Sequence, residues 1–213
     1  MRDPGLALVN PRTWILQGEK LDNGACRYNY TDAPTTIPKN GWARLSIAID
    51  PSTRRKLMEE GAASDPAALR AAAGISAGDS VGSASVLSRR GAWQAVNFYD
   101  IANIQLTTDV TQIYWDYNGS TVSNGSTSGV CANAPWWSLD YCYKSDSYPT
   151  GSYLGNTWSK FRTSFCVGLP TTYIYYYYNK LWGHPDGTAA RAQSSDSVDE
   201  CILLHNAVYA GYN

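Results

Sequence analysis

The stretch "TTYIYYYYNKLWGHPDG", Thr171–Gly187, decides the fold class of this chain. Five tyrosines stand among the six residues 173–178, and only Ile174 interrupts them. In an extended strand successive side chains point to opposite faces. Alternation therefore predicts one face made of Tyr173, Tyr175 and Tyr177. It predicts an opposite face made of Ile174, Tyr176 and Tyr178.

Ile174 marks the face that we expect to point inward. A tyrosine ring packs well while its hydroxyl stays hydrated, so tyrosine suits a buried face and an exposed one. We interpret the run as structural, with one face in the core and the other in cross-strand aromatic packing. The alternative is a ligand-binding surface of exposed rings, for which the candidates from this stretch are Tyr173, Tyr175, Tyr177 and Trp182.

The residues around this stretch predict further strands. "WWSLDYCY", "SKFRTSFCVG" and the region 93–119 are rich in aromatic and β-branched residues and are separated by Gly, Pro and Asn. Asp22-Asn23-Gly24, Asn118-Gly119 and Asp186-Gly187 are typical hairpin turns. "AQSSDSVDE" is predicted to be a polar loop. Strands at this spacing indicate a mostly β chain, folded as an antiparallel sandwich or a barrel-like sheet.

The region 52–74 interrupts the strand pattern. "DPSTRRKLMEEG" offers Ser52 or Thr53 as a cap and Gly61 as a stop. "SDPAALRAAAG" offers Asp65 as the N-cap, Pro66 in the first turn and Gly74 as the terminator. We therefore predict one or two short helices here.

Residues 61–91 consist mainly of Ala, Gly and Ser. Such a segment has little apolar surface to bury, and we expect a mobile connection. The predicted organisation is an N-terminal β segment over 1–60, the connection over 61–91 and a disulfide-containing β-rich domain over 92–213. A single domain spanning all three is the alternative.

Composition indicates the compartment and excludes some partners. Only 16% of the 213 residues are charged and the net charge is −1, so no basic field favours nucleic acid. No apolar run has the length of a membrane span, and residues 1–10 lack the apolar segment of a signal peptide. We expect a secreted protein in its mature form.

Five cysteines are present, and none belongs to a CxxC pair. This spacing favours disulfides over a zinc site, with five free thiols as the alternative. We predict the pairs Cys166–Cys201 and Cys131–Cys142, with Cys142–Cys166 as the rival. Cys26 would then be left over and available for an intermolecular disulfide.

The C-terminal pattern "SKFRTSFCVG … YYYNKLWGHPDGTA … CILLH" resembles that of small secreted actinobacterial proteins. In this chain the pattern comprises Phe165-Cys166, the tyrosine-rich strand, Asp186-Gly187, and Cys201 before Leu203-Leu204. "IDPSTRRKLMEEG" resembles the first half of the same proteins, although Arg54 and Arg55 stand where their pattern has a cysteine. The resemblance implies secretion and a β-rich fold, and it implies no activity.

Two arrangements suggest catalysis or metal binding. "GISAG", Gly74–Gly78, matches the G-x-S-x-G of hydrolases, and Asp and His residues follow it: Asp186, Asp196, Asp199 and His205. The segment before it is helical, however, so we interpret "GISAG" as a helix stop. His184 and Asp186 could bind a metal only with further ligands. We therefore expect no metal and no cofactor, and we expect His205 to be a strand residue.

The remaining candidates are aromatic or acidic. Trp115 and Tyr117 share one face of a predicted strand, as a sugar-stacking platform or as a core pair. A glycosidase needs two carboxylates, for which the candidates are Asp100, Asp109, Asp116 and Asp140. Asn29, Asn118 and Asn124 begin N-x-Ser/Thr sequons, which could be glycosylated in a eukaryotic secretory route. For the bacterial source that the resemblance suggests, we interpret them as turn chemistry.

We conclude from the sequence that this is a secreted, non-catalytic β-rich protein. It would bind a polysaccharide or a cell-surface component through exposed Tyr and Trp side chains. The alternatives are an extracellular hydrolase with a carboxylate pair and a subunit of a cell-surface assembly, in which the tyrosine face would be the interface.

Overall fold

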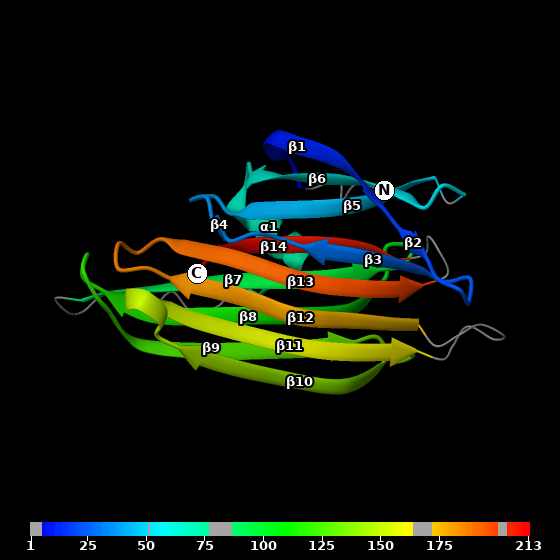
Figure 1. Ribbon diagram of the computed structural model, residues 1–213. Helices are drawn as coiled ribbons and strands as arrows, with labels where there is room; N and C mark the ends of the chain where they lie inside the picture. The colour runs from blue at the N-terminus through cyan, green and yellow to red at the C-terminus, as the bar shows by residue number, and fades with distance from the viewer. Residues whose placement is uncertain (1–5, 51, 77–86, 164–171, 200–203) are drawn as a thin grey trace.

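The computed structural model describes residues 6–50, 52–76, 87–163, 172–199 and 204–213. Two antiparallel sheets pack against each other along the length of the molecule (Figure 1). Sheet A has the strand order β1-β6-β5-β14-β7-β8-β9. Sheet B has the order β10-β11-β12-β13-β3-β2, and β4 also pairs with β13. The prediction of a mostly β antiparallel sandwich is confirmed.

The elements have the following bounds. Sheet A contains β1 (Leu8–Gln17), β5 (Trp42–Asp50), β6 (Arg55–Ala63), β7 (Ser88–Tyr99), β8 (Gln105–Tyr117), β9 (Val122–Asn133) and β14 (His205–Tyr212). Sheet B contains β2 (Glu19–Lys20), β3 (Cys26–Thr31), β4 (Thr35–Thr36), β10 (Ser138–Ser147), β11 (Tyr153–Thr163), β12 (Thr172–Gly183) and β13 (Ala189–Asp199). The helical elements of the described residues are α1 (Pro66–Ala73) and a 3₁₀ turn, η1 (Pro149–Gly151).

Three of the predicted hairpin turns form where glycine permits a positive φ. Gly24, Gly119 and Gly187 have φ angles of 84°, 90° and 80° and connect β2 to β3, β8 to β9 and β12 to β13. A left-handed backbone costs glycine little, because it has no Cβ. The turn dipeptides therefore place three hairpins correctly.

One predicted helix is present and the other is not. α1 begins after Asp65, whose side chain accepts a hydrogen bond from the Ala67 N–H, and it ends at the left-handed Gly74. The first predicted helix was wrong, because residues 55–63 form strand β6 between β5 and β1. Backbone pairing on both sides outweighs the helix propensity of this segment.

A second local prediction was also wrong. The polar segment 192–199 lies in β13, which pairs with β12 on one side and with β3 on the other. Ser195, Ser197 and Gln193 are buried there. Polar residues tolerate burial when hydrogen bonds satisfy them, as the bond from Ser195 Oγ to Gln193 Oε1 illustrates.

Both sheets combine strands from the two predicted β segments. β5 pairs with β14 in sheet A, and β3 pairs with β13 in sheet B. The N-terminal strands are therefore integral to the sandwich. Part of the predicted mobile connection, residues 77–86, lies outside the described residues, whereas 61–63 belong to β6 and 66–73 to α1.

Two apolar clusters occupy the space between the sheets. In the first, Phe98 from sheet A meets Tyr30 and Tyr176 from sheet B edge to face, with ring centroids 5.7 and 5.6 Å apart. In the second, Trp115 and Ile113 of β8 pack with Leu181 of β12. These clusters supply the hydrophobic stabilisation of the sandwich.

A belt of buried polar side chains lies between the two clusters. Along β8 the inward polar residues Asp109 and Thr111 come before the apolar Ile113 and Trp115 of the second cluster. Along β12 the inward Asn179 likewise comes before Leu181. We define the polar belt as the nearly buried Asp32 together with the buried residues Asp109, Thr111, Thr157, Ser159, Asn179, Gln94, Arg44, Arg191 and Gln193. Its members bond to one another across the sheets, as Thr157 Oγ1 and Asn179 Nδ2 do to Asp109.

One predicted disulfide is confirmed. Cys131 of β9 and Cys142 of β10 are bonded, with Cα atoms 6.1 Å apart, and they join the adjacent edges of the two sheets. Cys26 is also disulfide-bonded, so the prediction of an unpaired Cys26 was wrong. Cys166 and Cys201 both lie outside the described residues, and with them the pairing predicted for them.

Candidate functional site

The outward side of sheet B carries a continuous group of aromatic side chains. We call it the aromatic face and define it as Tyr141, Tyr143, Trp158, Tyr173, Tyr175 and Tyr177. They come from β10, β11 and β12, which lie side by side (Figure 1). The inward residues of the same strands, such as Phe161 and Ile174, are fully buried. Strand alternation thus separates a packed core side from an exposed aromatic side.

The predicted faces of the tyrosine run hold until a bulge. Ile174 and Tyr176 are buried while Tyr173, Tyr175 and Tyr177 point outward, as alternation requires. Between Tyr176 and Tyr178 the register with both neighbouring strands shifts. The extra residue of a β-bulge reverses the alternation, so Asn179 is buried and the prediction for Tyr178 was wrong.

The register arranges the aromatic face in rows across the strands. Tyr143 lies opposite Trp158, and their ring centroids are 5.8 Å apart. Tyr141 lies opposite Lys160, which lies opposite Tyr175. Along β12 the rings of Tyr175 and Tyr177 are nearly parallel, with centroids 5.9 Å apart. Each ring is therefore held in place by aromatic or cationic neighbours.

Charged side chains occupy one part of the aromatic face. Lys160 Nζ lies 4.7 Å from the ring centroid of Tyr173 and 5.1 Å from that of Tyr175. Asp140 forms ion pairs with both Lys160 and Arg162. Its Oδ2 lies 3.2 Å from Lys160 Nζ, and its Oδ1 lies 2.9 Å from Arg162 Nε. The cation–π contacts use ring surface of Tyr173 and Tyr175, which is then less available to a ligand.

The opposite part of the aromatic face is open. Tyr143 is 57% exposed and Tyr177 is 51% exposed. Trp158 is partly buried beside Tyr143, and β11 places it opposite the bulge of β12. Tyr177 Oη donates to Asp196 Oδ2 at 3.0 Å, and burial together with this carboxylate raises the pKa of Tyr177 to about 12. We call Tyr143, Trp158 and Tyr177 the open strip.

The other aromatic candidates have different environments. Trp115 is fully buried, and its Nε1 donates to the His184 carbonyl at 3.1 Å. Trp115 therefore presents no ring to a ligand, and this candidate was wrong. Tyr117 packs partly buried against the same cluster. Trp182 is partly buried on the outward side of β12, five residues beyond Tyr177.

Sequence reasoning missed Tyr141, Tyr143 and Trp158. A signal was available, because Cys142 separates the two tyrosines and alternation places them together on the opposite side. Which strand neighbours β12 could not be read from the chain order alone. Only the register of β10 on β11 brings Tyr143 next to Trp158.

The described residues of the predicted chemical motifs have separate structural roles. Gly74 ends α1, so the described part of "GISAG" is a helix stop. His205 stacks on Tyr99, and no carboxylate within the described ranges forms a hydrogen bond or ion pair with its imidazole. Asp186 accepts from the Thr188 N–H and hydroxyl, which lowers its pKa, and His184 Nδ1 lies 2.9 Å from Ser152 Oγ.

The four acidic candidates also have separate structural partners. Asp109 is buried in the polar belt, Asp140 binds Lys160 and Arg162, and Asp116 binds Arg89 and Asn124. Asp100 accepts hydrogen bonds from two N–H groups of its own turn. Among the described residues, no group of three or more His, Cys, Asp or Glu side chains is placed to hold a metal ion.

The asparagines of the three sequons also take part in local bonding. Asn29 Nδ2 donates to Asp196, and Asn124 Nδ2 donates to Asp116. Asn118 Oδ1 accepts from the backbone N–H groups of Ser120 and Thr121. These contacts agree with the interpretation of the sequons as local turn and strand chemistry.

Comparisons with known proteins identify no relative of this chain. No family model matches the chain, and neither the curated proteins nor the solved structures contain a significant match. The predicted resemblance to small secreted actinobacterial proteins therefore stays a prediction. Within the part of the chain that the structure describes, no helix is long and apolar enough to cross a membrane.

Proposed function

We propose that this protein is a secreted, non-catalytic module that binds polysaccharide through the open strip of sheet B. The observation that carries the proposal is the row Tyr143, Trp158 and Tyr177, which exposes aromatic rings on a rigid sheet. Sugar rings present apolar C–H surfaces, which pack on aromatic faces, while their hydroxyl groups need polar partners nearby. The open strip offers the rings, and Asp140, Lys160 and Arg162 beside it offer the polar partners.

Secretion is part of the same proposal. The Cys131–Cys142 disulfide and the bonded state of Cys26 support an oxidising compartment. Few charged residues and many tyrosines give a surface suited to an uncharged, hydroxylated ligand. A rigid strand surface also loses little conformational entropy when it binds, which favours an extended polymer as the partner.

Retention on insoluble polysaccharide tests the proposal. The protein would be mixed with microcrystalline cellulose, chitin or insoluble xylan, and the bound fraction measured after centrifugation. We expect retention on at least one of them. Replacing Tyr143 and Tyr177 together with Ala should weaken retention about 30-fold, since each aromatic contact contributes on the order of 1 kcal/mol.

Trp136→Ala is the matched control. Trp136 is an exposed aromatic residue in the β9–β10 loop, outside the open strip, and its carbonyl bond to Thr163 does not depend on the side chain. Its removal should leave retention unchanged. Equal weakening by Trp136→Ala, or no retention of the parent on any of the three polymers, would reject the proposal. Concentration-dependent association lost in the Tyr143/Tyr177 variant would favour the assembly-subunit alternative instead.

A further inference from the structure

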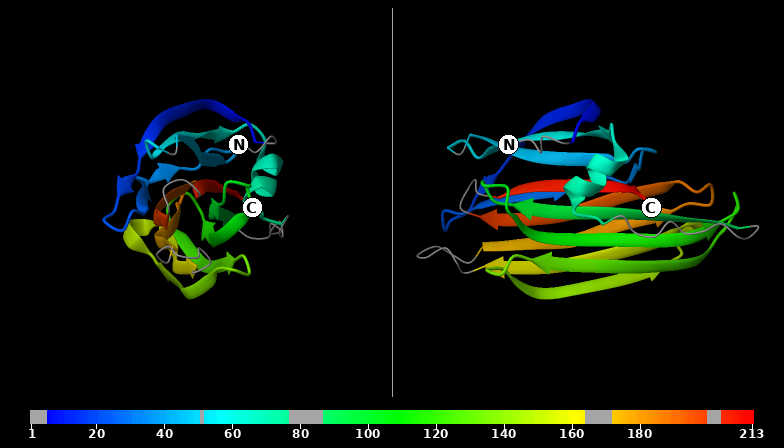
Figure 2. Two further views of the ribbon diagram at one scale, coloured as in Figure 1. Left: turned by 90° about the vertical axis from the view of Figure 1, so that its right-hand side faces the viewer. Right: turned by 180° about the vertical axis from the view of Figure 1, so that it is seen from behind.

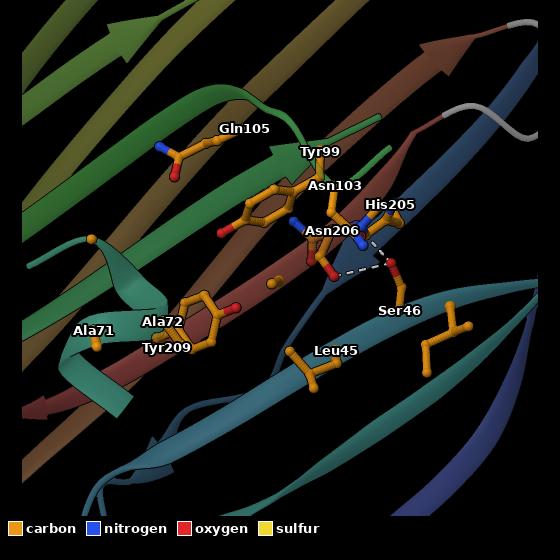
Figure 3. Close-up of a pocket in the computed structure, with 13 residues that line it drawn as sticks. Leu45, Ser46, Ala71, Ala72, Tyr99, Asn103, Gln105, His205, Asn206 and Tyr209 are labelled. Atoms are coloured by element: carbon orange, nitrogen blue, oxygen red, sulfur yellow. Dashed lines mark hydrogen bonds between the residues drawn. The ribbon is translucent and has the colours of Figure 1, made fainter. Parts of the chain in front are cut away.

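A pocket of about 430 Å³ opens on the outward side of sheet A, remote from the aromatic face. Helix α1 lies over this side of the sheet, next to β14 and β7 (Figure 2, right). The pocket is formed by α1, β5, β14 and the β7–β8 connection (Figure 3). Its volume lies in the range of small-molecule sites.

Apolar and aromatic side chains form the part of the pocket next to the helix. Tyr209 and Ala72 lie together beside the helix, and Leu45 lies to their right in the view (Figure 3). All three belong to, or pack against, the apolar cluster between α1 and sheet A. This cluster fixes the wall, so the apolar end of the pocket is preformed.

Aromatic stacking forms a second wall. The rings of Tyr99 and His205 are nearly parallel, with centroids 5.5 Å apart. Burial lowers the pKa of His205 to about 4, so its imidazole is neutral near pH 7. None of the side chains recorded as lining the pocket is then charged. Asp100 and Lys56 act electrostatically on His205 but do not line the pocket, so a charged ligand would lose its hydration here without meeting an opposite charge on the wall.

Two parts of the pocket carry polar groups that are available to a ligand. Asn103 and His205 lie near each other, and Gln105 lies apart from them, beside Gly74 at the end of α1 (Figure 3). The side chains of all three make no hydrogen bond to any other described residue. By contrast, Ser46 and the Asn206 backbone bond to each other, and the Asn206 side chain bonds to Arg44. Two amides and one imidazole are therefore left as donors and acceptors in the pocket.

We propose that this pocket binds an uncharged small molecule that has an apolar ring and a hydrogen-bonding group at one end. The ring packs between Tyr209, Leu45 and Ala72. The polar group reaches the Gln105 amide. This site shares no residue with the open strip, so the proposal for the pocket can be confirmed or rejected independently of polysaccharide binding.

A pair of fluorescent probes tests the preference for uncharged ligands. N-phenyl-1-naphthylamine is uncharged, and 8-anilino-1-naphthalenesulfonate has the same rings with an added sulfonate. We expect saturable one-to-one binding of the first probe, and at least tenfold weaker binding of the second. Equal affinity for both probes, or binding of neither, would overturn the proposal.

Substitutions on α1 locate the probe. Ala72→Phe should fill the apolar end and weaken binding of the uncharged probe at least tenfold. Ala71→Trp, at an exposed position that also lines the pocket, should do the same if Ala72→Phe impairs folding. Ala67→Phe is the control, because Ala67 is exposed on the same helix away from the pocket. Unchanged affinity in both pocket variants would place the probe elsewhere and reject the site.

Competition by two further uncharged compounds tests the polar end. 1-Naphthol should displace the probe several-fold better than naphthalene, because its hydroxyl can bond at Gln105. Gln105→Leu should remove most of this preference while leaving naphthalene unaffected. Gln105 is a better position than Asn103, whose φ of 60° disfavours most other side chains. A preference that survives Gln105→Leu would contradict the assignment of the polar end.

Discussion

Two aspartates in this molecule each hold two cations, one inside the sandwich and one on its surface. In the polar belt, Asp32 binds Arg44 and Arg191, and both arginine side chains are only 2% exposed. On the aromatic face, Asp140 binds Lys160 and Arg162 on the outside of sheet B. The same chemical arrangement thus occurs in two regions that differ in their access to water.

The difference shows that polarity alone does not sort residues between interior and surface here. The belt buries charged and amide side chains because they find partners, as Arg44 of sheet A does with Asp32, which follows β3 of sheet B. The aromatic face leaves tyrosines in water, which their hydroxyl groups tolerate. Partners decide what can be buried, and the buried arrangement should be much more costly to break.

Removing the inner aspartate should have the largest effect. Asp32→Ala would leave Arg44 and Arg191 buried without their carboxylate, and we expect a loss of about 3–5 kcal/mol in the free energy of unfolding. Asp140→Ala, the surface counterpart, should cost under about 1 kcal/mol, because water screens that pair. Denaturant titration of both variants measures the difference. Similar losses in the two would show that the belt and the surface do not differ as argued.

Substitutions of Asp109 should have the next largest effect on the free energy of unfolding, and this effect should depend on pH. Asp109→Leu leaves the buried donors of Ser159 and Asn179 without their acceptor and should cost about 3 kcal/mol. Asp109→Asn keeps an acceptor and removes an acid whose pKa burial raises above 3.8. It should therefore be as stable as the parent, or more stable, at pH 7.

The sign of the pH dependence follows from that raised pKa. The protonated acid is favoured in the folded state, so its stabilising contribution is present below 3.8 and is lost as pH rises through the raised folded-state pKa. Any advantage of Asp109→Asn over the parent should consequently shrink as pH falls toward 4. Thermal unfolding at several pH values measures this, and an advantage that grows on acidification would contradict the raised pKa.

Substitutions in the open strip should have the smallest effect on stability. Tyr143 and Tyr177 are each more than half exposed, so replacing either with Ala should change the free energy of unfolding by under about 1 kcal/mol. Unfolding by urea checks this, with Phe161→Ala as the buried comparison, for which a loss of about 3–5 kcal/mol is expected. A large loss at Tyr143 or Tyr177 would mean that the aromatic face is chiefly structural.

Some of the architecture could be predicted because it depends on neighbours in the chain. The hairpins at Gly24, Gly119 and Gly187 were predicted from turn residues alone, and α1 from Asp65, Pro66 and Gly74. Long-range pairing was not available in this way. Residues 55–63 look helical by themselves, and only β1 and β5 on either side make them a strand.

The candidate site was predicted in part for the same reason. Alternation correctly placed Tyr173, Tyr175 and Tyr177 on one outward face. It failed at Tyr178 because the bulge arises from pairing with β11 and β13. It left a sugar-stacking platform and a core pair open at Trp115, because an aromatic pair on one strand face has the same sequence pattern whether or not another sheet covers it.

The sequence by itself determined the β-rich class, three tight turns, one helix and the two faces of the tyrosine strand. Each depends on backbone preferences and alternation over a few residues, which act within a short segment. Only the tertiary structure decided that Asp32 and Asp109 are interior, that Tyr143 joins Trp158 and Tyr177, and that α1 borders a pocket. Those outcomes depend on which strands pair and which sheet faces meet, because distant segments supply the hydrogen bonds and exclude the water.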